Sequence, residues 1–136
     1  MVKVIMGVKG SGKTKLLIEL VEAALQEARG DVIVIEKEPS LTYDIPHQAR
    51  LIVAAEYDFG STDFMKGFIS AILASNYDVT HVFIDNLYKM FEDRSIAGAE
   101  DFLDLLDAFS TKSGIAFTLT LSAPLETATE RIRKYF

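Results

Sequence analysis

The sequence contains no cysteine, and its two histidines, His47 and His81, lie far apart. The absence of cysteine excludes disulfide bonds and thiol chemistry, and it suits a reducing compartment such as the cytoplasm. Two distant histidines argue against a histidine-rich metal cage. Cysteine and histidine chemistry are therefore not expected here.

Long apolar runs are also missing. No run approaches the roughly 20 residues that a membrane-spanning helix requires. Residues 1–6 are too short for the apolar core of a signal peptide, and they lead directly into a glycine-rich loop. We therefore expect a soluble, cytoplasmic protein without a membrane partner.

Positive charge is in the minority, since the formal net charge is −6 and the estimated pI is 4.9. An acidic surface repels the nucleic-acid backbone, so nucleic acid is not an expected partner. The dense basic run near the start, Lys9, Lys13 and Lys15, is an exception that a phosphate site would use for itself.

The 136 residues, 49% of them apolar, fit a single domain over 1–136. Short apolar runs alternate with amphipathic segments, which is typical of α/β proteins with a mainly parallel sheet covered by helices. Five runs are predicted to be strands: 2–6, 32–35, 51–55, 81–84 and 115–121. We therefore expect a three-layer α/β/α domain with a five-stranded sheet.

Threonines within the fifth run, and one serine and two glycines at three helix ends, give further expectations. Thr118 and Thr120 alternate with apolar residues, which predicts a strand beside a wet feature or near an edge of the sheet. Ser61 is placed to cap a helix. Gly30 and Gly114 are placed to end two others.

Residues 7–14 read Gly-Val-Lys-Gly-Ser-Gly-Lys-Thr and satisfy the phosphate-loop pattern G-x-x-x-x-G-K-[ST]. Glycines let the backbone amides turn inward toward phosphate, and the following helix adds the positive end of its dipole. Lys13 would neutralise the β- and γ-phosphates and assist catalysis, while the hydroxyl of Thr14 would bind magnesium. The expected ligand is a nucleoside triphosphate, ATP with Mg²⁺. The expected contacts are Gly7, Lys9, Gly10, Ser11, Gly12, Lys13, Thr14 and Lys15.

Asp85 ends the fourth apolar run, where a phosphate-loop protein places the acid that holds the magnesium water shell. We therefore assign Asp85 to the metal together with Thr14. The alternative is that Asp85 only caps the segment that follows it.

The acid that activates water is less clearly marked, because Asn86 follows Asp85. Glu36 and Glu38 follow the second predicted strand and Glu56 follows the third, so all three are expected at the carboxyl edge of a parallel sheet. Glu36 is the first choice and Glu38 the second. The alternative is that they are solvated loop residues.

Hydroxyls and arginines offer weaker candidates. Thr120 and Ser122 could sense a γ-phosphate, although a half-exposed strand would explain them equally well. Arg94, Arg131 and Arg133 are candidates for an arginine that acts on a neighbouring subunit's site.

The order of these features resembles the RecA/KaiC/DnaB-helicase group of P-loop ATPases. The resemblance rests on GVKGSGKT, Glu36, HVFIDN and GIAFTLTLSAP. It implies a RecA-like fold in which Glu36 or Glu38 activates the attacking water. The whole chain also resembles small uncharacterised bacterial ATP-binding proteins, some of them labelled twitching-motility proteins.

Three functions stay open. The first is nucleotide binding with slow or partner-dependent hydrolysis of the triphosphate. The second is a small-molecule kinase whose acceptor would contact the loop that contains Tyr43, Asp44 and His47. The third is a non-hydrolysing switch or assembly module that acts through a homo-oligomer or a protein partner. The base of the nucleotide is not predicted.

Overall fold

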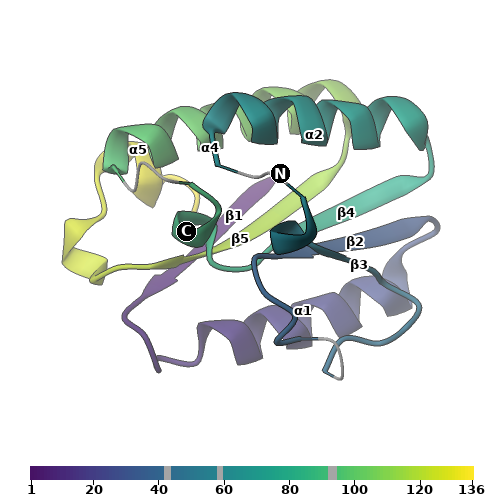
Figure 1. The fold of residues 1–136 in the computed structure, drawn as a ribbon, viewed down its shortest axis with the longest axis horizontal. Coiled ribbons are helices and arrows are strands. Elements are labelled where there is room, and N and C mark those ends of the chain that lie inside the picture. Colours follow the sequence, from purple (N-terminus) through teal and green to yellow (C-terminus); the bar gives the residue numbers. More distant parts are fainter. Residues whose placement is uncertain (42–43, 58–59, 92–94) are drawn as a thin grey trace.

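Five strands form one parallel sheet in the computed structural model, which describes residues 1–41, 44–57, 60–91 and 95–136 (Figure 1). The strands are β1 (Val2–Gly7), β2 (Asp31–Glu36), β3 (Arg50–Val53), β4 (Val79–Ile84) and β5 (Ala116–Ser122). Their order across the sheet is β1-β5-β4-β2-β3, and every neighbouring pair is parallel. The first and third strands along the chain are therefore the two edges.

Helices cover both faces of the sheet (Figure 1). They are α1 (Lys13–Glu27), α2 (Thr62–Ser75), α3 (Leu87–Met90), α4 (Ile96–Ser113) and α5 (Glu130–Arg133), with short 3₁₀ turns at Ala54–Glu56 and Leu125–Thr127. Helix α1 lies on one face, and α2 and α4 lie on the other. This is a three-layer arrangement, as expected from strands that are apolar on both faces.

Each face has its own apolar core. Under α1, Leu17 and Val21 pack on Val34 and Phe83, and the loop after β2 adds Leu41 to the same cluster. On the other face a larger cluster joins α2, α4 and α5 to the sheet, including Met65, Ile69, Phe102, Leu106 and Ile132. The sheet is thus held rigidly between two layers, and its carboxyl edge can position loops.

The predicted strands are confirmed with small shifts at their ends. The one notable difference is in the third, because β3 stops at Val53 and residues Ala54–Glu56 form a 3₁₀ turn. Two of the expected helix ends are confirmed, at Ser61 and at Gly114. Ser61 accepts the N–H of Phe64 at 3.0 Å, and Gly114 ends α4 with φ 78°.

The fifth strand was predicted beside a wet feature or near an edge; β5 is an internal strand, directly next to the edge strand β1, and its Thr120 lines the cleft described below. Strand β5 pairs with β1 on one side and β4 on the other. Thr118 and Thr120 are buried, with exposed fractions of 7% and 1%. Thr120 is polar because it bonds to groups at the carboxyl edge of the sheet, as described below.

Gly30 follows α1 as predicted, but for a different physical reason. The helix ends at Glu27 with Ala28 as its C-cap residue, and Gly30 does not adopt the left-handed conformation of a helix-ending glycine. Instead, a β-carbon at this position would lie 1.9 Å from the carbonyl oxygen of Asp78. Glycine is needed because two backbone segments meet here.

Within the described part of the chain, no helix is both long enough and apolar enough to cross a membrane.

Candidate functional site

A cleft of about 480 Å³ opens at the carboxyl edge of the sheet. Parallel strands end on the same side, so the loops after β1, β2, β4 and β5 meet there. The residues that line the cleft come from these loops and from the starts of α1 and α3: Lys9, Gly10, Gly12, Lys13, Thr14, Lys15, Glu36, Lys37, Glu38, Ser40, Asp85, Asn86, Lys89, Thr120 and Ser122. The cleft therefore collects most of the residues that the sequence singled out.

The glycine loop, residues 7–14, depends on its glycines for its shape. Gly10 and Gly12 adopt φ values of 81° and 89°, which side chains rarely tolerate. Gly7 has a different need, since a β-carbon there would lie 2.6 Å from the Ser11 hydroxyl oxygen. The N–H of Ser11 donates to the carbonyl of Val8 at 3.2 Å and closes a tight turn.

Helix α1 starts inside the cleft without a side-chain cap. Its N-cap residue is Gly12, which has no side-chain oxygen to accept the free amides of the first turn. Helices α2 and α4 begin differently, because Ser61 and Ser95 accept the N–H of Phe64 and Gly98. The start of α1 thus presents unpaired amides and the positive end of a helix dipole to the cleft.

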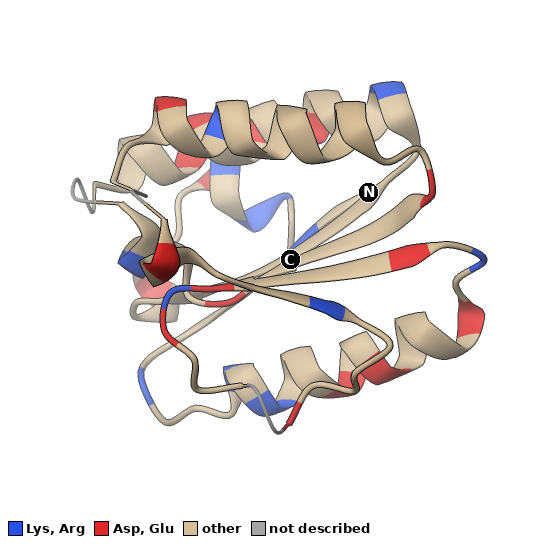
Figure 2. Ribbon diagram, turned by 45° about the vertical axis from the view of Figure 1, so that its right-hand side comes forward, with Lys and Arg blue, Asp and Glu red and all other residues tan. Residues whose placement is uncertain are grey.

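Positive side chains gather around this helix start on a chain with a net charge of −6. Five lysines line the cleft, namely Lys9, Lys13, Lys15, Lys37 and Lys89. Figure 2 shows basic residues in the loop that leads into α1 and in its first turn. Lys13 is 8% exposed, and its ammonium group donates to the carbonyl of Val8 at 2.9 Å. The local charge is suited to an anion.

Asp85 faces the start of α1 across the cleft. The hydroxyl oxygen of Thr14 lies 3.4 Å from each of its carboxylate oxygens. Thr120 donates to Asp85 at 2.7 Å and accepts the N–H of Asn86 at 2.7 Å, which fixes the carboxylate in the sheet. The N–H of Asp85 also donates to Ile35 in β2. Sequence analysis predicted Asp85 beside Thr14, and the structure brings them together.

The alternative role of Asp85 as a helix cap is not seen. The N-cap residue of α3 is Asn86, and among the described residues no side-chain cap bond is made there. The carboxylate of Asp85 instead bonds to threonines from β5 and α1.

The donors around Asp85 suit one kind of metal ion. The described residues contain no group of three or more His, Asp or Glu side chains that could hold a metal by themselves. Asp85 and Thr14 together offer a carboxylate and a hydroxyl. Mg²⁺ is commonly held by one or two such oxygens, with water and phosphate completing its octahedron. The pair fits Mg²⁺ brought in with a phosphate ligand.

Glu36 lies in the floor of the cleft and is 2% exposed. Both of its carboxylate oxygens accept the N–H of Leu41, at 3.0 and 3.2 Å. Burial raises the pKa of this carboxyl, the Leu41 and Ser40 amides lower it, and the charges of Asp85 and Asp44 raise it further. The net direction is upward from the ordinary value of 4.5. Glu36 is therefore a proton acceptor of raised affinity that its own loop holds in place.

The other two predicted acids are placed differently. Glu38 is exposed and lines the cleft. Glu56 lies in the 3₁₀ turn after β3, outside the residues that line the cleft. The reason is the strand order, because β3 is the outer strand next to β2 and is the strand furthest from β1.

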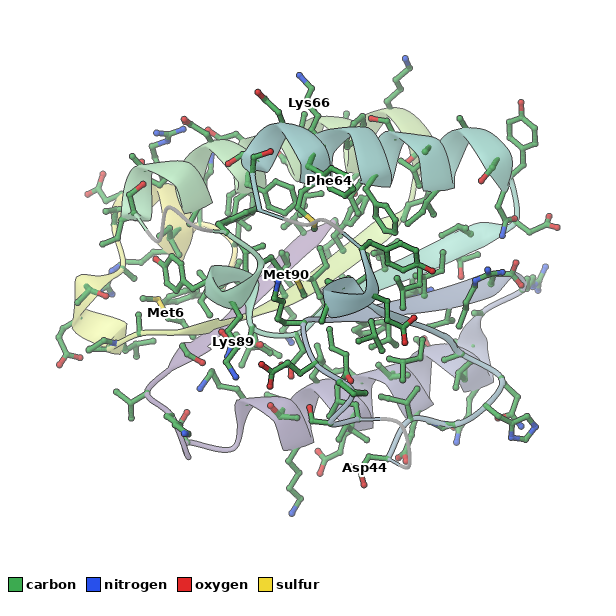
Figure 3. All side chains as sticks on the ribbon, in the orientation of Figure 1. Met6, Asp44, Phe64, Lys66, Lys89 and Met90 are labelled. Atoms are coloured by element: carbon green, nitrogen blue, oxygen red, sulfur yellow. The ribbon has the colours of Figure 1, made fainter. Side chains whose placement is uncertain are left out.

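Sequence analysis missed two lysines of the cleft. Lys37 follows Glu36 directly, and Lys89 comes from α3 after Asp85. In Figure 3 Lys89 extends from α3 toward the side on which α1 lies, whereas Lys66 extends outward from α2. For Lys89, the signal in the sequence was its position four residues after Asp85.

The predicted arginines of the C-terminal tail lie outside the cleft. Arg131 pairs with three acids of α4, at 2.7 Å from Glu100, 3.1 Å from Asp101 and 2.6 Å from Asp104. Arg133 donates to the carbonyl of Ala128. Arg94, with Tyr43 of the proposed acceptor loop, falls outside the described residues. His47 is exposed and Asp44 acts on Glu36 through its charge, but neither lines the cleft.

Comparison of the sequence with models of protein families and with curated protein sequences gives no match, so the ligand of this cleft has to be inferred from its own residues.

Proposed function

We propose that the chain is a P-loop domain of RecA-like type that binds ATP with Mg²⁺ and hydrolyses it slowly or only with a partner. One observation carries the proposal: the uncapped start of α1 brings Lys13 and Thr14 to face Asp85 in one cleft. An amide-lined helix start suits phosphate, a lysine suits its charge, and a hydroxyl–carboxylate pair suits Mg²⁺.

Each part of the cleft has a separate task in this proposal. The amides of the glycine loop and the first turn of α1 hold the phosphate oxygens. Lys13 leaves the carbonyl of Val8 and moves its ammonium group to the β- and γ-phosphates. Thr14 and Asp85 would hold Mg²⁺, which would supply positive charge beside the phosphates.

Slow hydrolysis follows from the state of Glu36. A carboxylate activates water only when that water can reach one of its oxygens. Glu36 is 2% exposed, and the N–H of Leu41 holds its carboxylate against residues 37–41. In this proposal residues 37–41 shift to admit the attacking water, and a partner that contacts this loop would speed the reaction. Glu38, which is exposed at the rim, is the second candidate for the same step.

Calorimetric titration with ATP–Mg²⁺ and with ADP tests the proposal on the wild type and on Lys13→Ala. Loss of a charge-assisted contact predicts affinity weaker by about tenfold or more. The matched control is Lys66→Ala, which removes an exposed lysine on the outer side of α2. Equal affinity of the wild type and Lys13→Ala, with both proteins folded, would contradict the proposal.

The same observation on Glu36 favours a second candidate, a nucleotide-dependent switch that binds but does not hydrolyse. In that case bound nucleotide would move residues 37–41 and change the affinity for a second copy or another protein. Native mass spectrometry with and without ATP–Mg²⁺ separates the two candidates. A change of assembly without release of phosphate supports the switch, and release of phosphate by an unchanged monomer supports the hydrolase.

A further inference from the structure

A second hollow of about 480 Å³ opens directly beside the cleft, and we call it the side pocket. It shares four residues with the cleft: Lys9, Asn86, Lys89 and Ser122. The two hollows therefore adjoin along these four residues, one of which, Asn86, directly follows Asp85 in the chain.

The far wall of the side pocket differs in chemistry from the cleft. It is formed by Tyr88 of α3, Ile96 at the start of α4, and Ala123 and Pro124 after β5, with Thr127 at the rim. Apolar walls with a few polar groups at one end are typical of sites for small organic molecules. An inorganic ion alone would leave this wall unused.

The polar groups gather at the shared end. Lys9 and Lys89 bring two positive charges, and Asn86 and Ser122 bring an amide and a hydroxyl. Asn86 has φ 55°, and among the described residues it is the one non-glycine residue with positive φ. Backbone conformations of this kind cost free energy and gather at functional sites. Here the conformation is held by the bond from the N–H of Asn86 to Thr120.

Tyr88 contributes to the wall as a residue that is 8% exposed. Its hydroxyl oxygen is buried and, within the described residues, has no hydrogen-bond partner. The polar contacts open to a ligand are therefore those at the shared end of the pocket.

We propose that the side pocket binds a small organic carboxylate with an apolar body. The carboxylate would lie between Lys9 and Lys89, and the body would pack on Ile96 and Pro124. A carboxylate fits better than a phosphate, because the backbone amides that favour phosphate lie in the glycine loop. This inference goes beyond nucleotide binding, since the pocket does not require an occupied glycine loop.

The probes for the test are phenylacetate and benzoate, with neutral phenylacetamide and plain acetate as controls. Each is titrated at millimolar concentration while backbone amide NMR signals are followed, first with ADP–Mg²⁺ present and then in Lys13→Ala without nucleotide. Saturable shifts confined to Asn86, Tyr88, Ile96 and Ala123 are expected for the aromatic carboxylates. Acetate lacks the body and phenylacetamide lacks the charge, so both should bind about tenfold more weakly or worse.

Substitutions locate the binding. Lys89→Met should weaken phenylacetate about tenfold, while Lys66→Met should leave its affinity unchanged. Thr127→Trp should fill the pocket and abolish the shifts, whereas Thr127→Ser should keep them along with the bond to Pro124. Because Thr127 is exposed, neither change touches the core.

Three results would overturn the proposal: no saturable shift with either aromatic carboxylate, shifts confined to residues 7–15, or equal binding by phenylacetamide. The outcome is separable from that of the proposed function. Lys13→Ala is expected to lose ATP and keep phenylacetate, so either ligand can fail without the other.

Discussion

Glu36 and Leu41 are joined by a hydrogen bond in which the Leu41 N–H lies 3.0 Å from one oxygen of the Glu36 carboxylate. Leu41 is itself buried against Leu17 and Val21 of α1. The bond therefore connects the floor of the cleft to the core beneath α1. Because burial and the charge of Asp85 both raise the pKa of Glu36, the contribution of Glu36 to the free energy of unfolding depends on pH.

Replacing Glu36 with glutamine should make the protein less sensitive to rising pH. A carboxyl with a raised folded-state pKa binds more protons in the folded than in the unfolded state, so stability falls as pH rises above the ordinary value near 4.5. Glutamine does not titrate and still accepts the Leu41 N–H. The free energy of unfolding of Glu36→Gln, minus that of the wild type, should therefore increase from pH 4.5 upward until it levels off. Denaturant melts at a series of pH values measure this difference.

The control for that series is Glu56→Gln, an exposed carboxyl outside the cleft. The difference in free energy of unfolding between Glu56→Gln and the wild type should change less over the same pH range. A difference for Glu36→Gln that stays constant with pH, or decreases, would contradict a raised pKa.

Removing the hydroxyl of Thr120 should destabilise the fold. Valine has nearly the same shape but cannot donate to Asp85 or accept the N–H of Asn86. Leaving buried polar groups without partners costs about 1–3 kcal/mol. The matched control is Thr118→Val, two residues earlier in β5, because within the described residues the Thr118 side chain makes no hydrogen bond. Equal unfolding free energies for the two variants would show that the Thr120 bonds contribute little.

Asp85→Asn should separate metal binding from phosphate binding. The amide keeps an oxygen that accepts from Thr120 but loses the charge that holds Mg²⁺. We expect Asp85→Asn to keep its affinity for ADP in the absence of metal. The increase in ADP affinity that added Mg²⁺ produces should fall by about tenfold. Titrations at several Mg²⁺ concentrations measure that gain, and an unchanged gain would remove Asp85 from the metal site.

Two glycines should respond to alanine in opposite directions. At Gly30 a β-carbon would meet the Asp78 carbonyl at 1.9 Å, so Gly30→Ala forces two backbone segments apart and should cost about 1–3 kcal/mol. At Gly67, inside α2, no atom lies within 4 Å of the added carbon among those described. There alanine favours the helix and should stabilise the protein by about 1 kcal/mol. Thermal melts of both variants check the contrast.

The sequence was sufficient for the strands and the glycine loop because both have strong local signals. Five apolar runs separated by amphipathic segments predicted five strands, and the structure has them. Six of the eight predicted contacts, Lys9, Gly10 and Gly12 to Lys15, line the cleft because they belong to one short motif. Gly7 and Ser11 line a neighbouring hollow instead. Asp85 could also be predicted from the sequence, since it directly follows an apolar run that forms a strand.

The order of the strands in the sheet could not be predicted from the sequence. That order decides which of the three candidate acids lie close enough to the cleft to activate water. Glu36, Glu38 and Glu56 all follow strands, but β3 lies at the outer edge and leaves Glu56 away from the cleft. The polar alternation in β5 was similarly ambiguous. An edge strand and an internal strand that reaches a polar site give the same pattern, and only the pairing of β5 on both sides, as at Thr118, distinguishes them.

Strand β5 separates the strand that ends in the glycine loop from the strand that ends at Asp85. In the β1–β5 register Gly7 is opposite Ser122, and in the β5–β4 register Leu119 is opposite Ile84. A shift of one residue in either strand register would move Thr14 relative to Asp85 by about 3.3 Å. The two side chains would then no longer bind the same metal ion. Strand β5 thus fixes the spacing between Thr14 and Asp85. An insertion within β5 would move these two side chains apart without changing either residue.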